Sequence, residues 1–396
     1  MMYFKDEVLT FIEEENVQFI KLLFFDVFGR QKNVSILPSR MSRTFEKGVT
    51  IDATAVTGFN NPDHSDLVLK PDPSTMTVLP WRSIDGCVIY MICDLYYPDG
   101  RRFDYDIRYI LQKAVKKAQK VGLTIEMAAK FEFYLLKLDE LGEKTNIPMD
   151  QAGYMDAAPL DRAENIRRDI CLTLNEMGIE PHKSYHQYGK GQNEVDFHFN
   201  TALNAADEAA IFKWVVRSTA HLNGLWADFS PRPFKNQPGS GLHIQMRFFD
   251  TEDERIKEQF MAGILKYIRQ MTLFLNPNKQ SYDRFGKDQA PLFIDWSDQT
   301  RFTLLRIPAL SPDIMEVRSP DCTCSVYLAF ALLIEAGLKG IEDQLELIEP
   351  GACKRQDSMD ILPTSLEEAK ALAIESDFIA NVLPDHIINT YIKKDQ

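Results

Sequence analysis

Four side chains of the types that bind divalent metals stand on segments with the pattern of β-strands: Glu132, Glu194, His243 and Glu316. Carboxylates combined with one histidine suit magnesium or manganese. Three arginines lie close to the last of them in the sequence: Arg301, Arg306 and Arg318. A guanidinium group holds phosphate or carboxylate groups through paired hydrogen bonds. The set therefore indicates a site that binds a metal ion together with an anionic ligand.

Each of these residues also has an ordinary structural explanation. A single glutamate on a strand most often faces solvent, and His243 on an alternating strand is most often a hydrogen-bonded structural histidine. Arg306 and Arg318 could simply form ion pairs with Glu316. Residue types and spacing alone leave both interpretations open.

The segment "AAKFEFYLL", residues 128–136, makes the choice concrete. Its apolar side chains alternate with polar ones, as in a half-buried strand, so that Lys130 and Glu132 share the face opposite Phe131 and Phe133. An exposed pair on such a face would contribute only about 0–1 kcal/mol. The alternative is that this face is the floor of a binding site.

The surrounding pattern predicts an α+β protein with a small β-rich front domain, residues 1–100, and a larger domain of strands and helices, residues 101–396. Two strands are expected over 17–36 around a turn at Gly29, and more over 65–98. A helix is expected from near Asp104, another is expected to end at Gly178 with Asp161 as its cap, and Ser365 with Glu368 forms a capping box. The segment "SVYLAFALLIEAGLKGIE" predicts a mostly buried helix.

Composition, charge and the absence of common motifs exclude several classes of function. The chain has 396 residues and a net charge of −13, which argues against nucleic acid and anionic membranes as partners. No apolar run is long enough to span a membrane, and the acidic start does not resemble a signal peptide. The six scattered cysteines indicate a reduced, cytoplasmic protein. Phosphate-loop, dinucleotide-binding, zinc-protease and nucleophile-elbow motifs are absent.

Seven segments in order resemble the glutamine synthetase family over nearly the whole chain: "KPDPST", "GYMDAAPLD", "GQNEVDF", "GSGLHI", "SYDRFG", "RFTLLRIP" and "MEVRSPD" followed by "YLAFALLIEAGL". The resemblance implies a β-grasp-like N-terminal domain and a catalytic domain with a curved antiparallel sheet. It implies a ring or double ring of roughly ten to twelve subunits, with each active site shared between neighbours. It also implies ATP and two magnesium or manganese ions, used to join ammonia to glutamate.

The resemblance assigns roles to individual residues. Glu132 and Glu194 match ligands of the first metal, while His243 and Glu316 match ligands of the second. Gly239, Arg284, Arg318 and Tyr154 match substrate-binding positions. Arg301, Arg306, Gln245 and Arg247 stand at nucleotide-binding positions. Asp52 and Arg301 match catalytic residues, and Asp52 is expected to serve a neighbouring subunit.

The departures from the family fall at the centre of this chemistry. Lys130 stands where the family has a glutamate, and Gln289 stands where a catalytic glutamate takes a proton from ammonium. The third ligand of the first metal, a glutamate in the family, is Gln187 here, or His186 if the alignment shifts by one residue. Other changes are these: Gln245 and Arg247 replace a histidine and a serine, Ile314 replaces an arginine, and Ala53, Thr54 and Ala55 replace a serine-rich turn.

These departures predict that the second metal is lost and that activity is low. We expect the Lys130 ammonium to occupy roughly the place of that metal, within salt-bridge distance of Glu316 and close to His243. An ammonium about 4 Å from a divalent ion costs about 8 kcal/mol at an effective dielectric near 20. A glutamine cannot act as a general base, which contributes about 10²–10⁴-fold. We expect a pseudoenzyme that binds a ligand such as glutamate or has a regulatory role, for example by assembling with active paralogous subunits. An active ligase with a modified metal site (a glutamine synthetase or γ-glutamyl-amine synthetase) and a purely structural ring are the alternatives.

Overall fold

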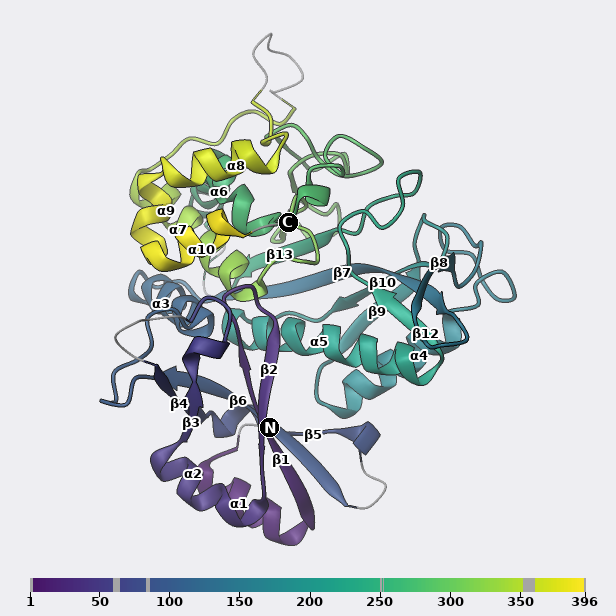
Figure 1. The fold of residues 1–396 in the computed structure, drawn as a ribbon. Helices are drawn as coiled ribbons and strands as arrows, with labels where there is room; N and C mark the ends of the chain where they lie inside the picture. Colours follow the sequence, from purple (N-terminus) through teal and green to yellow (C-terminus); the bar gives the residue numbers. More distant parts are fainter. Residues whose placement is uncertain are drawn as a thin grey trace. The chain divides into compact units, whose positions relative to one another are not determined.

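The computed structural model describes residues 3–59, 65–82, 86–249, 251, 253–351 and 360–394 (Figure 1). The chain divides into two compact units, which we describe separately. Unit 1 comprises Met1–Leu111 with Asn175–Ile179, and unit 2 comprises Gln112–Leu174 with Glu180–Gln396. Five cysteines are free thiols, and Cys353 lies outside the described residues. In the described part of the chain, no helix is both long and apolar enough to cross a membrane.

Among the described residues, unit 1 contains a six-stranded sheet in the order β2-β1-β6-β4-β3, with β5 paired to β6. The strands are β1 (Val17–Phe25), β2 (Gln31–Ile36), β3 (Val49–Asp52), β4 (Asp66–Pro71), β5 (Thr77–Val78) and β6 (Cys87–Tyr96). β1 and β2 form the predicted hairpin, and Gly29 in its turn has a φ of 73°. Glycine adopts this left-handed conformation without the steric cost of a Cβ atom. β1 runs parallel to β6, so the sheet is mixed.

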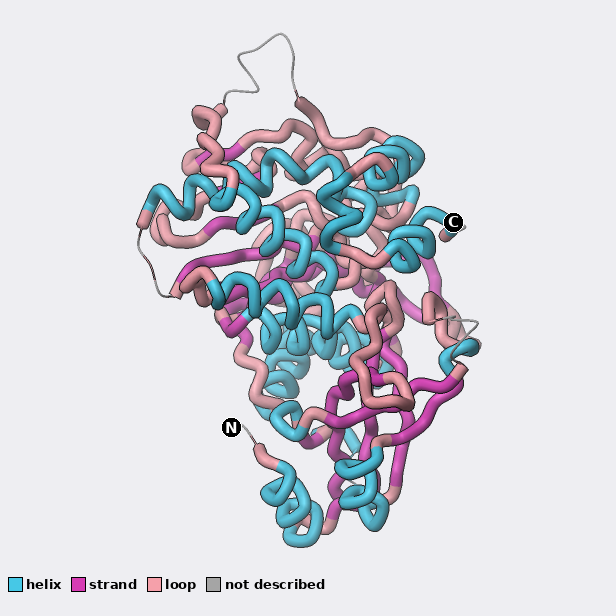
Figure 2. The backbone as a smooth tube through the Cα atoms, turned by 90° about the vertical axis from the view of Figure 1, so that its left-hand side faces the viewer, coloured by secondary structure: helices cyan, strands magenta, loops and turns pink. Residues whose placement is uncertain are grey.

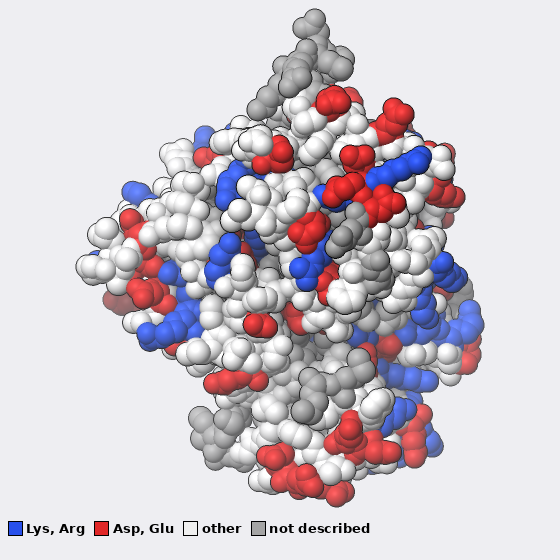
Figure 3. Space-filling view, turned by 180° about the vertical axis from the view of Figure 1, so that it is seen from behind, with Lys and Arg blue, Asp and Glu red and all other residues white. Residues whose placement is uncertain are grey.

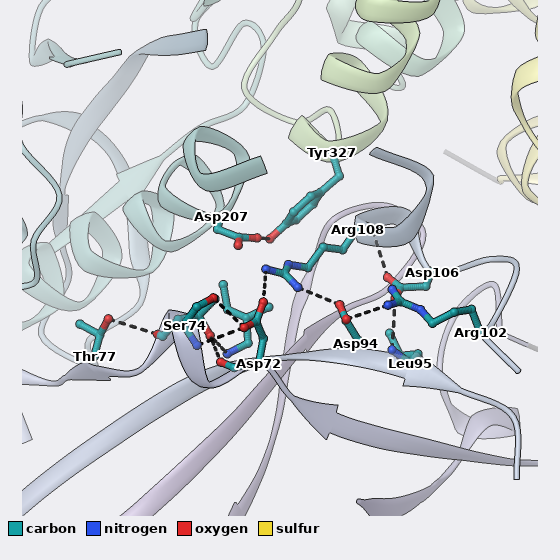
Figure 4. A network of polar contacts seen from close by, with 12 residues as sticks. Asp72, Ser74, Thr77, Asp94, Leu95, Arg102, Asp106, Arg108, Asp207 and Tyr327 are labelled. Atoms are coloured by element: carbon teal, nitrogen blue, oxygen red, sulfur yellow. Dashed lines mark hydrogen bonds and ion pairs between the residues drawn. The ribbon is translucent and has the colours of Figure 1, made fainter. Parts of the chain in front are cut away.

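Helices α1 (Lys5–Glu14) and α2 (Met41–Lys47) pack against this sheet, α1 on β1 and α2 on β4 (Figure 1). A polar network ties β6 to the segment that follows it (Figure 4). The buried Arg108 side chain donates to Asp94 over 2.7 Å and to Asp72 over 2.9 Å. Arg102 donates to Asp94 over 2.7 Å and to Asp106 over 3.3 Å. Burying these charges is tolerable because every one of them has an opposite partner.

The helix expected from near Asp104 is α3 (Ile107–Lys120). It begins slightly later than predicted because the carboxylate of Asp106 accepts the backbone N–H of Arg108 over 3.0 Å. An acidic side chain in this position satisfies a donor that has no partner within the helix.

Unit 2 is built on a ten-stranded sheet, counted over the described residues, in the order β14-β15-β16-β13-β7-β10-β9, with β8, β11 and β12 paired to β7. The strands are β7 (Ile125–Leu138), β8 (Lys144–Pro148), β9 (Pro181–His186), β10 (Gln192–Phe197), β11 (Asn200–Thr201), β12 (Leu225–Asp228), β13 (Leu242–Phe248), β14 (Trp296–Ser297), β15 (Leu305–Arg306) and β16 (Met315–Val317). The expected sheet was antiparallel, but β14 and β15 pair in parallel, so this sheet is mixed. The α+β class is confirmed.

The helices of unit 2 are α4 (Glu164–Glu176), α5 (Ala202–Leu222), α6 (Glu254–Leu275), α7 (Val326–Glu342), α8 (Leu366–Ile374), α9 (Asp377–Val382) and α10 (Asp385–Lys393). α5 packs on β7, whereas α6 packs against α7, α8 and α9 (Figures 1 and 2). α6 and α7 approach closely because Gly263 faces Gly340: a Cβ on Gly263 would lie 2.8 Å from the Gly340 nitrogen. The predicted buried helix is α7; most of its apolar residues are buried, whereas Leu338 and Ile341 near its end are partly exposed.

Of the two predicted helix caps, one is wrong and the other is confirmed in part. Asp161 is not the cap of α4, because the helix begins at Glu164; instead Asp161 accepts the N–H of Ala163 over 2.9 Å and pairs with Arg167. The Ser365 hydroxyl does cap α8 by accepting the N–H of Glu368 over 3.1 Å. The Glu368 carboxylate accepts from the backbone of Thr364, however, so the predicted reciprocal box is only half present.

The net charge of −13 is not displayed as a uniform acidic surface. On the face drawn in Figure 3, acidic and basic side chains are interspersed.

Candidate ligand and metal site

A cavity of about 600 Å³ lies over the polar face of the unit 2 sheet. It brings together most of the residues singled out from the sequence: Lys130, Glu132, Tyr154, Gln187, Glu194, His243, Gln245, Gln289, Arg301, Arg306, Glu316 and Arg318. They come from distant parts of the chain, so their meeting here is a property of the tertiary structure. The polar face of "AAKFEFYLL" is therefore the floor of a cavity and not an open solvated surface.

The alternation of β7 is what presents Lys130 and Glu132 to this cavity. On the opposite face, Phe131 and Phe133 are inaccessible to solvent. The Phe131 ring centroid lies 4.9 Å from that of Phe212 on α5, and the Phe133 centroid lies 5.4 Å from that of Phe229. Burial of these aromatic rings fixes the register, because a shift by one residue would turn the charged side chains into the core.

Glu132 and Glu194 lie directly opposite each other on neighbouring antiparallel strands. The amide Nε2 of Gln187 donates to both, over 2.9 Å to Glu132 Oε1 and 2.5 Å to Glu194 Oε2. The backbone N–H of Gly241 donates to Glu132 Oε2 over 2.6 Å, and the Tyr185 hydroxyl donates to Glu194. Burial raises the pKa of both carboxyls; repulsion from Glu194 adds to this for Glu132. A cation between them would relieve the repulsion.

The structure distinguishes Gln187 from His186 at this position. Gln187 lines the cavity, whereas His186 is fully buried on the other side of the strand end. The ring of His186 has its Nε2 2.9 Å from Asp150 Oδ1 and its Nδ1 2.7 Å from the carbonyl oxygen of Gln187. Gln187 is therefore the side chain available beside the two glutamates.

Glu132, Glu194 and Gln187 form what we call the first cluster. The second cluster consists of Glu316, which is fully buried, and the side chains that contact it. Its Oε2 accepts from Lys130 Nζ over 2.8 Å and from Gln245 Nε2 over 2.9 Å. Its Oε1 accepts from Arg318 over 2.8 Å and lies 3.5 Å from a guanidinium nitrogen of Arg306. Although burial alone would raise the pKa of Glu316, Lys130 and the other nearby positive charges hold it well below its ordinary range. The predicted ion pair between Lys130 and Glu316 is present.

His243 lies beside this cluster, directly across from Lys130 in the pairing of β13 with β7. Burial and the positive charge of Arg318 lower its pKa well below the ordinary value. The imidazole is thus held neutral, the form in which histidine accepts a hydrogen bond or binds a metal.

Comparison with known proteins identifies this arrangement. Residues 104–396 match the family described as "Glutamine synthetase, catalytic domain", and residues 16–98 match "Glutamine synthetase, beta-Grasp domain". The chain belongs to the glutamine synthetase family. A glutamine synthetase of Methanosarcina mazei is 37% identical, with 98% of this chain and 92% of that protein covered. The sheet of unit 1 is accordingly a β-grasp domain.

Solved structures share the fold at lower identity. A chain described as "GmaS/ADP complex-Conformation 1" superposes with a TM-score of 0.88 at 24% identity, covering 97% of this chain and 94% of that one. A glutamine synthetase of Plasmodium falciparum gives a TM-score of 0.88 at 20% identity, covering 99% of this chain and 95% of that one. At these identities the similarity shows the fold alone.

Members of the glutamine synthetase family use divalent metals, and the two clusters differ in how well they fit one. Glu132 and Glu194 are buried, opposed carboxylates, with Gln187 able to present a carbonyl oxygen beside them; this donor set fits magnesium or manganese. The side chains around Glu316 do not fit a divalent ion as they stand, because Lys130 and Arg318 already take its oxygens. Within the described ranges, no three His, Cys, Asp or Glu side chains converge as metal ligands would.

Four predicted site residues do not line the cavity, and their roles stay predictions. Arg247 pairs with Glu126 over 2.7 Å. Arg284 is buried, donates to the carbonyl of Ser319 over 3.2 Å and packs against Gly239, where a Cβ would lie 2.5 Å from its Cγ. Asp52 is exposed at the end of β3 in unit 1, where its carboxylate accepts from the Thr54 hydroxyl over 2.6 Å.

The sequence analysis did not single out several residues that line the cavity, among them Tyr185, Tyr188 and Asp196, nor the nearby Gly241. Asp196 lies opposite Lys130 on β10, is almost inaccessible to solvent and is 3.5 Å from the Lys183 ammonium. The alternation in "NEVDF" places it on the same face as Glu194 and could have revealed it. The ring of Tyr188 stacks on Tyr154 with centroids 4.3 Å apart. Gly241 acts through its backbone N–H, which no side-chain pattern can indicate.

Proposed function

We propose that this glutamine synthetase-family protein binds a nucleotide and an acidic amino acid but forms glutamine slowly or not at all, and acts as a ligand-binding or regulatory pseudoenzyme. The observation that carries the proposal is the chemistry of the cavity wall. Gln187 and Gln289 line the cavity at positions where the family resemblance places glutamates. An amide cannot take a proton from an ammonium substrate, and that step contributes about 10²–10⁴-fold to the rate.

The arginines support retained binding of anionic ligands. Arg301 and Arg306 line the cavity, and Arg306 remains partly accessible to it. Arg318 is held by Glu316 at the cavity floor. Guanidinium groups fixed in this way bind phosphate or carboxylate through paired hydrogen bonds. A purely structural role would not require such a cationic wall inside a cavity, so we disfavour it.

Glu132 and Glu194, with Gln187, would hold a divalent ion of the kind that members of this family use. When bound, that ion supplies positive charge beside phosphate oxygens. The chain's own residues then bind and orient: the arginines face anionic groups, and the tyrosines Tyr154 and Tyr188 form an aromatic wall.

A second candidate function is an active ATP-dependent ligase that joins a carboxylate to an amine larger than ammonia. The stacked rings of Tyr154 and Tyr188, with Tyr185 edge-on to Tyr154 at 5.8 Å, favour this candidate. Aromatic faces attract ammonium groups, including substituted ones. Such an enzyme would be a γ-glutamyl-amine synthetase with a modified metal site.

The proposal also includes an oligomeric state. We propose a ring or double ring of roughly ten to twelve subunits, as the family resemblance implies. In such a ring the exposed Asp52 would face a neighbouring subunit, either another copy of this chain or an active paralogue.

Phosphate release and ligand binding measured side by side test the proposal. Purified protein receives ATP with magnesium or manganese, glutamate, and either ammonium or methylamine. We expect phosphate release far below about 1 s⁻¹ with ammonium. We also expect thermal shifts with ATP and with acidic amino acids at millimolar concentration. The ATP shift should fall in Arg301→Ala but not in Arg43→Ala, which removes an exposed arginine of unit 1.

Other outcomes of these two measurements would point to a different function. Turnover at about 1 s⁻¹ or faster with ammonium would overturn the proposed loss of activity. The same rate with methylamine alone would establish the γ-glutamyl-amine ligase. If the protein shows no turnover and no ligand changes its melting temperature, the structural ring remains as the explanation.

A further inference from the structure

We propose that the Lys130 ammonium is a resident cation that takes the place of a divalent ion at Glu316, so that each chain binds one divalent ion instead of two. The proposal concerns the same cavity as the proposed function, but it holds whether or not glutamine is formed. Two ions are what the family resemblance implies. The proposed number of ions differs from that number because of residues particular to this chain, above all Lys130.

The first step is the saturation of Glu316. A carboxylate has about four positions at which it accepts hydrogen bonds. Glu316 already faces four donor groups: Lys130 at 2.8 Å, Gln245 at 2.9 Å, Arg318 at 2.8 Å and Arg306 at 3.5 Å. A divalent ion would have to displace the ammonium and turn away at least one further donor.

The second step is that the Lys130 side chain is held in place. Lys130 lies on the central strand β7, and its side chain is only 13% exposed, while that of Glu316 is 0% exposed. His243 lies across from it on β13 and Asp196 across from it on β10. A lysine on a β-strand with a fully buried partner has little freedom to swing out into solvent and leave the site to a metal.

The third step is charge balance. The groups that face Lys130 from the neighbouring strands are acidic or neutral: Glu194 and Asp196 on β10, His243 on β13 and Glu316 on β16. Arg306 and Arg318 also face Glu316, but without the ammonium this group of carboxylates would have one positive charge fewer, and Glu194 and Asp196 would repel Glu316 in a poorly solvated cavity. The ammonium removes that repulsion permanently, and the same positive charge repels a divalent ion that approaches Glu316.

The first cluster keeps the features of an ion site. No lysine or arginine contributes to the contacts of Glu132 and Glu194 described above, which come from an amide, a backbone N–H and a hydroxyl. These neutral donors can turn or be displaced without separating opposite charges. We therefore assign the one divalent ion to Glu132, Glu194 and Gln187.

Counting bound manganese tests the proposal. Free Mn²⁺ is measured by electron paramagnetic resonance during titration of the full-length, metal-stripped protein. We expect one ion per chain in the wild type, two in Lys130→Glu, and one in the matched control Lys137→Glu. Lys137 lies on the same strand and is exposed, so this control makes the same change of charge outside the cavity. Glu132→Gln should weaken the wild-type ion at least about tenfold.

A second experiment covers the possibility that Lys130→Glu folds poorly. Lys130→Met removes the ammonium and should lower the melting temperature in EDTA, because it leaves Glu316 buried with less compensation. Adding Glu316→Gln to it should recover much of that loss, as expected for two groups in direct contact. If Lys130→Glu folds only when Mn²⁺ is present, that also supports the proposal.

Three results would overturn it. Two Mn²⁺ ions per wild-type chain would show that Lys130 does not exclude the second ion. A folded Lys130→Glu that still binds one ion would show that the second site is closed for another reason. An unchanged melting temperature in Lys130→Met would show that the ammonium does not balance Glu316.

Discussion

The side-chain amide of Gln187 donates a hydrogen bond of 2.9 Å to the carboxylate of Glu132. The same nitrogen also reaches Glu194, so one neutral amide lies between two buried carboxylates. An amide can satisfy their hydrogen bonding but cannot neutralise their charge. Two ionised carboxylates here therefore repel each other unless a proton or a cation is bound, which determines how variants at this position should behave.

Gln187→Glu should bind Mn²⁺ more tightly and be less stable without it. A third carboxylate adds a charged ligand to the first cluster but also adds repulsion between buried groups. Isothermal titration with Mn²⁺ and thermal melting in EDTA measure the two effects. Gln245→Glu is not an equivalent change, because Gln245 donates to Glu316 in the other cluster. Equal Mn²⁺ affinity in the Gln187→Glu variant and the wild type would exclude Gln187 from the ion site.

Stability without metal should fall as the pH rises. Burial raises the pKa of Glu132 and Glu194 in the folded protein above the ordinary value of 4.5. Above pH 4.5 the folded state therefore holds protons that the unfolded state has lost, so the free energy of unfolding decreases with rising pH until the raised pKa values are passed. Melting temperatures between about pH 5 and pH 8, with EDTA or with Mg²⁺, measure the effect.

Comparing the pH dependence of stability in EDTA and in Mg²⁺ separates the contribution of Glu132 and Glu194 from that of other groups. The bound ion replaces the protons, so the decrease should be smaller in Mg²⁺ than in EDTA, and Glu132→Gln should flatten the EDTA curve. Asp106 and Glu208, whose pKa values are raised to about 6 and about 7, contribute in the same direction, but neither lines the cavity and neither should respond to the ion. Parallel EDTA and Mg²⁺ curves would contradict the assignment of the ion to this pair.

Restoring carboxylates should restore turnover only in combination. The triple variant Lys130→Glu, Gln187→Glu, Gln289→Glu should form glutamine at least about 10²-fold faster than the single variant Gln289→Glu. A general base at position 289 is of little use while the metal ligands differ from those of the family. Glutamine formation is measured directly, with the triple variant carrying Arg301→Ala as the control. A fast Gln289→Glu single variant would show that the metal site was never limiting.

In unit 1, Arg108→Ala should cost about 3–5 kcal/mol of unfolding free energy. It leaves the carboxylates of Asp72 and Asp94 without the guanidinium that lies between them (Figure 4). The matched control is Arg101→Ala, which breaks an exposed ion pair with Asp99 and should cost about 0–1 kcal/mol. Urea unfolding compares the two; similar losses would mean that burial of the Arg108 network is unimportant.

The purified protein should be a large closed oligomer. Light scattering coupled to size-exclusion chromatography should give the mass of a ring or double ring of roughly ten to twelve chains of 45.5 kDa. The prediction depends on the family resemblance and on the exposed position of Asp52. A stable monomer at micromolar concentration would refute it.

Much of the architecture followed from the sequence alone. Alternation in "AAKFEFYLL" predicted the strand β7 and the side on which Lys130 and Glu132 lie, because side-chain direction on a strand has a period of two. The family resemblance predicted that Glu194, His243 and Glu316 would join them. Charge reasoning predicted that Lys130 would pair with Glu316, since an ammonium and a carboxylate on one buried face must find each other.

The remaining features were decided by the tertiary structure. Whether Gln187 or His186 faces the cavity depends on how β9 ends and on the position of Asp150, and neither is visible in local spacing. Arg247 shares the strand face of His243, yet it pairs with Glu126 because of the register between β13 and β7. Lys130 and Glu316 are 186 positions apart in the chain. Sequence periodicity fixes which way a side chain points, whereas its partners are set by strand order and register, which arise from burial of the whole apolar face.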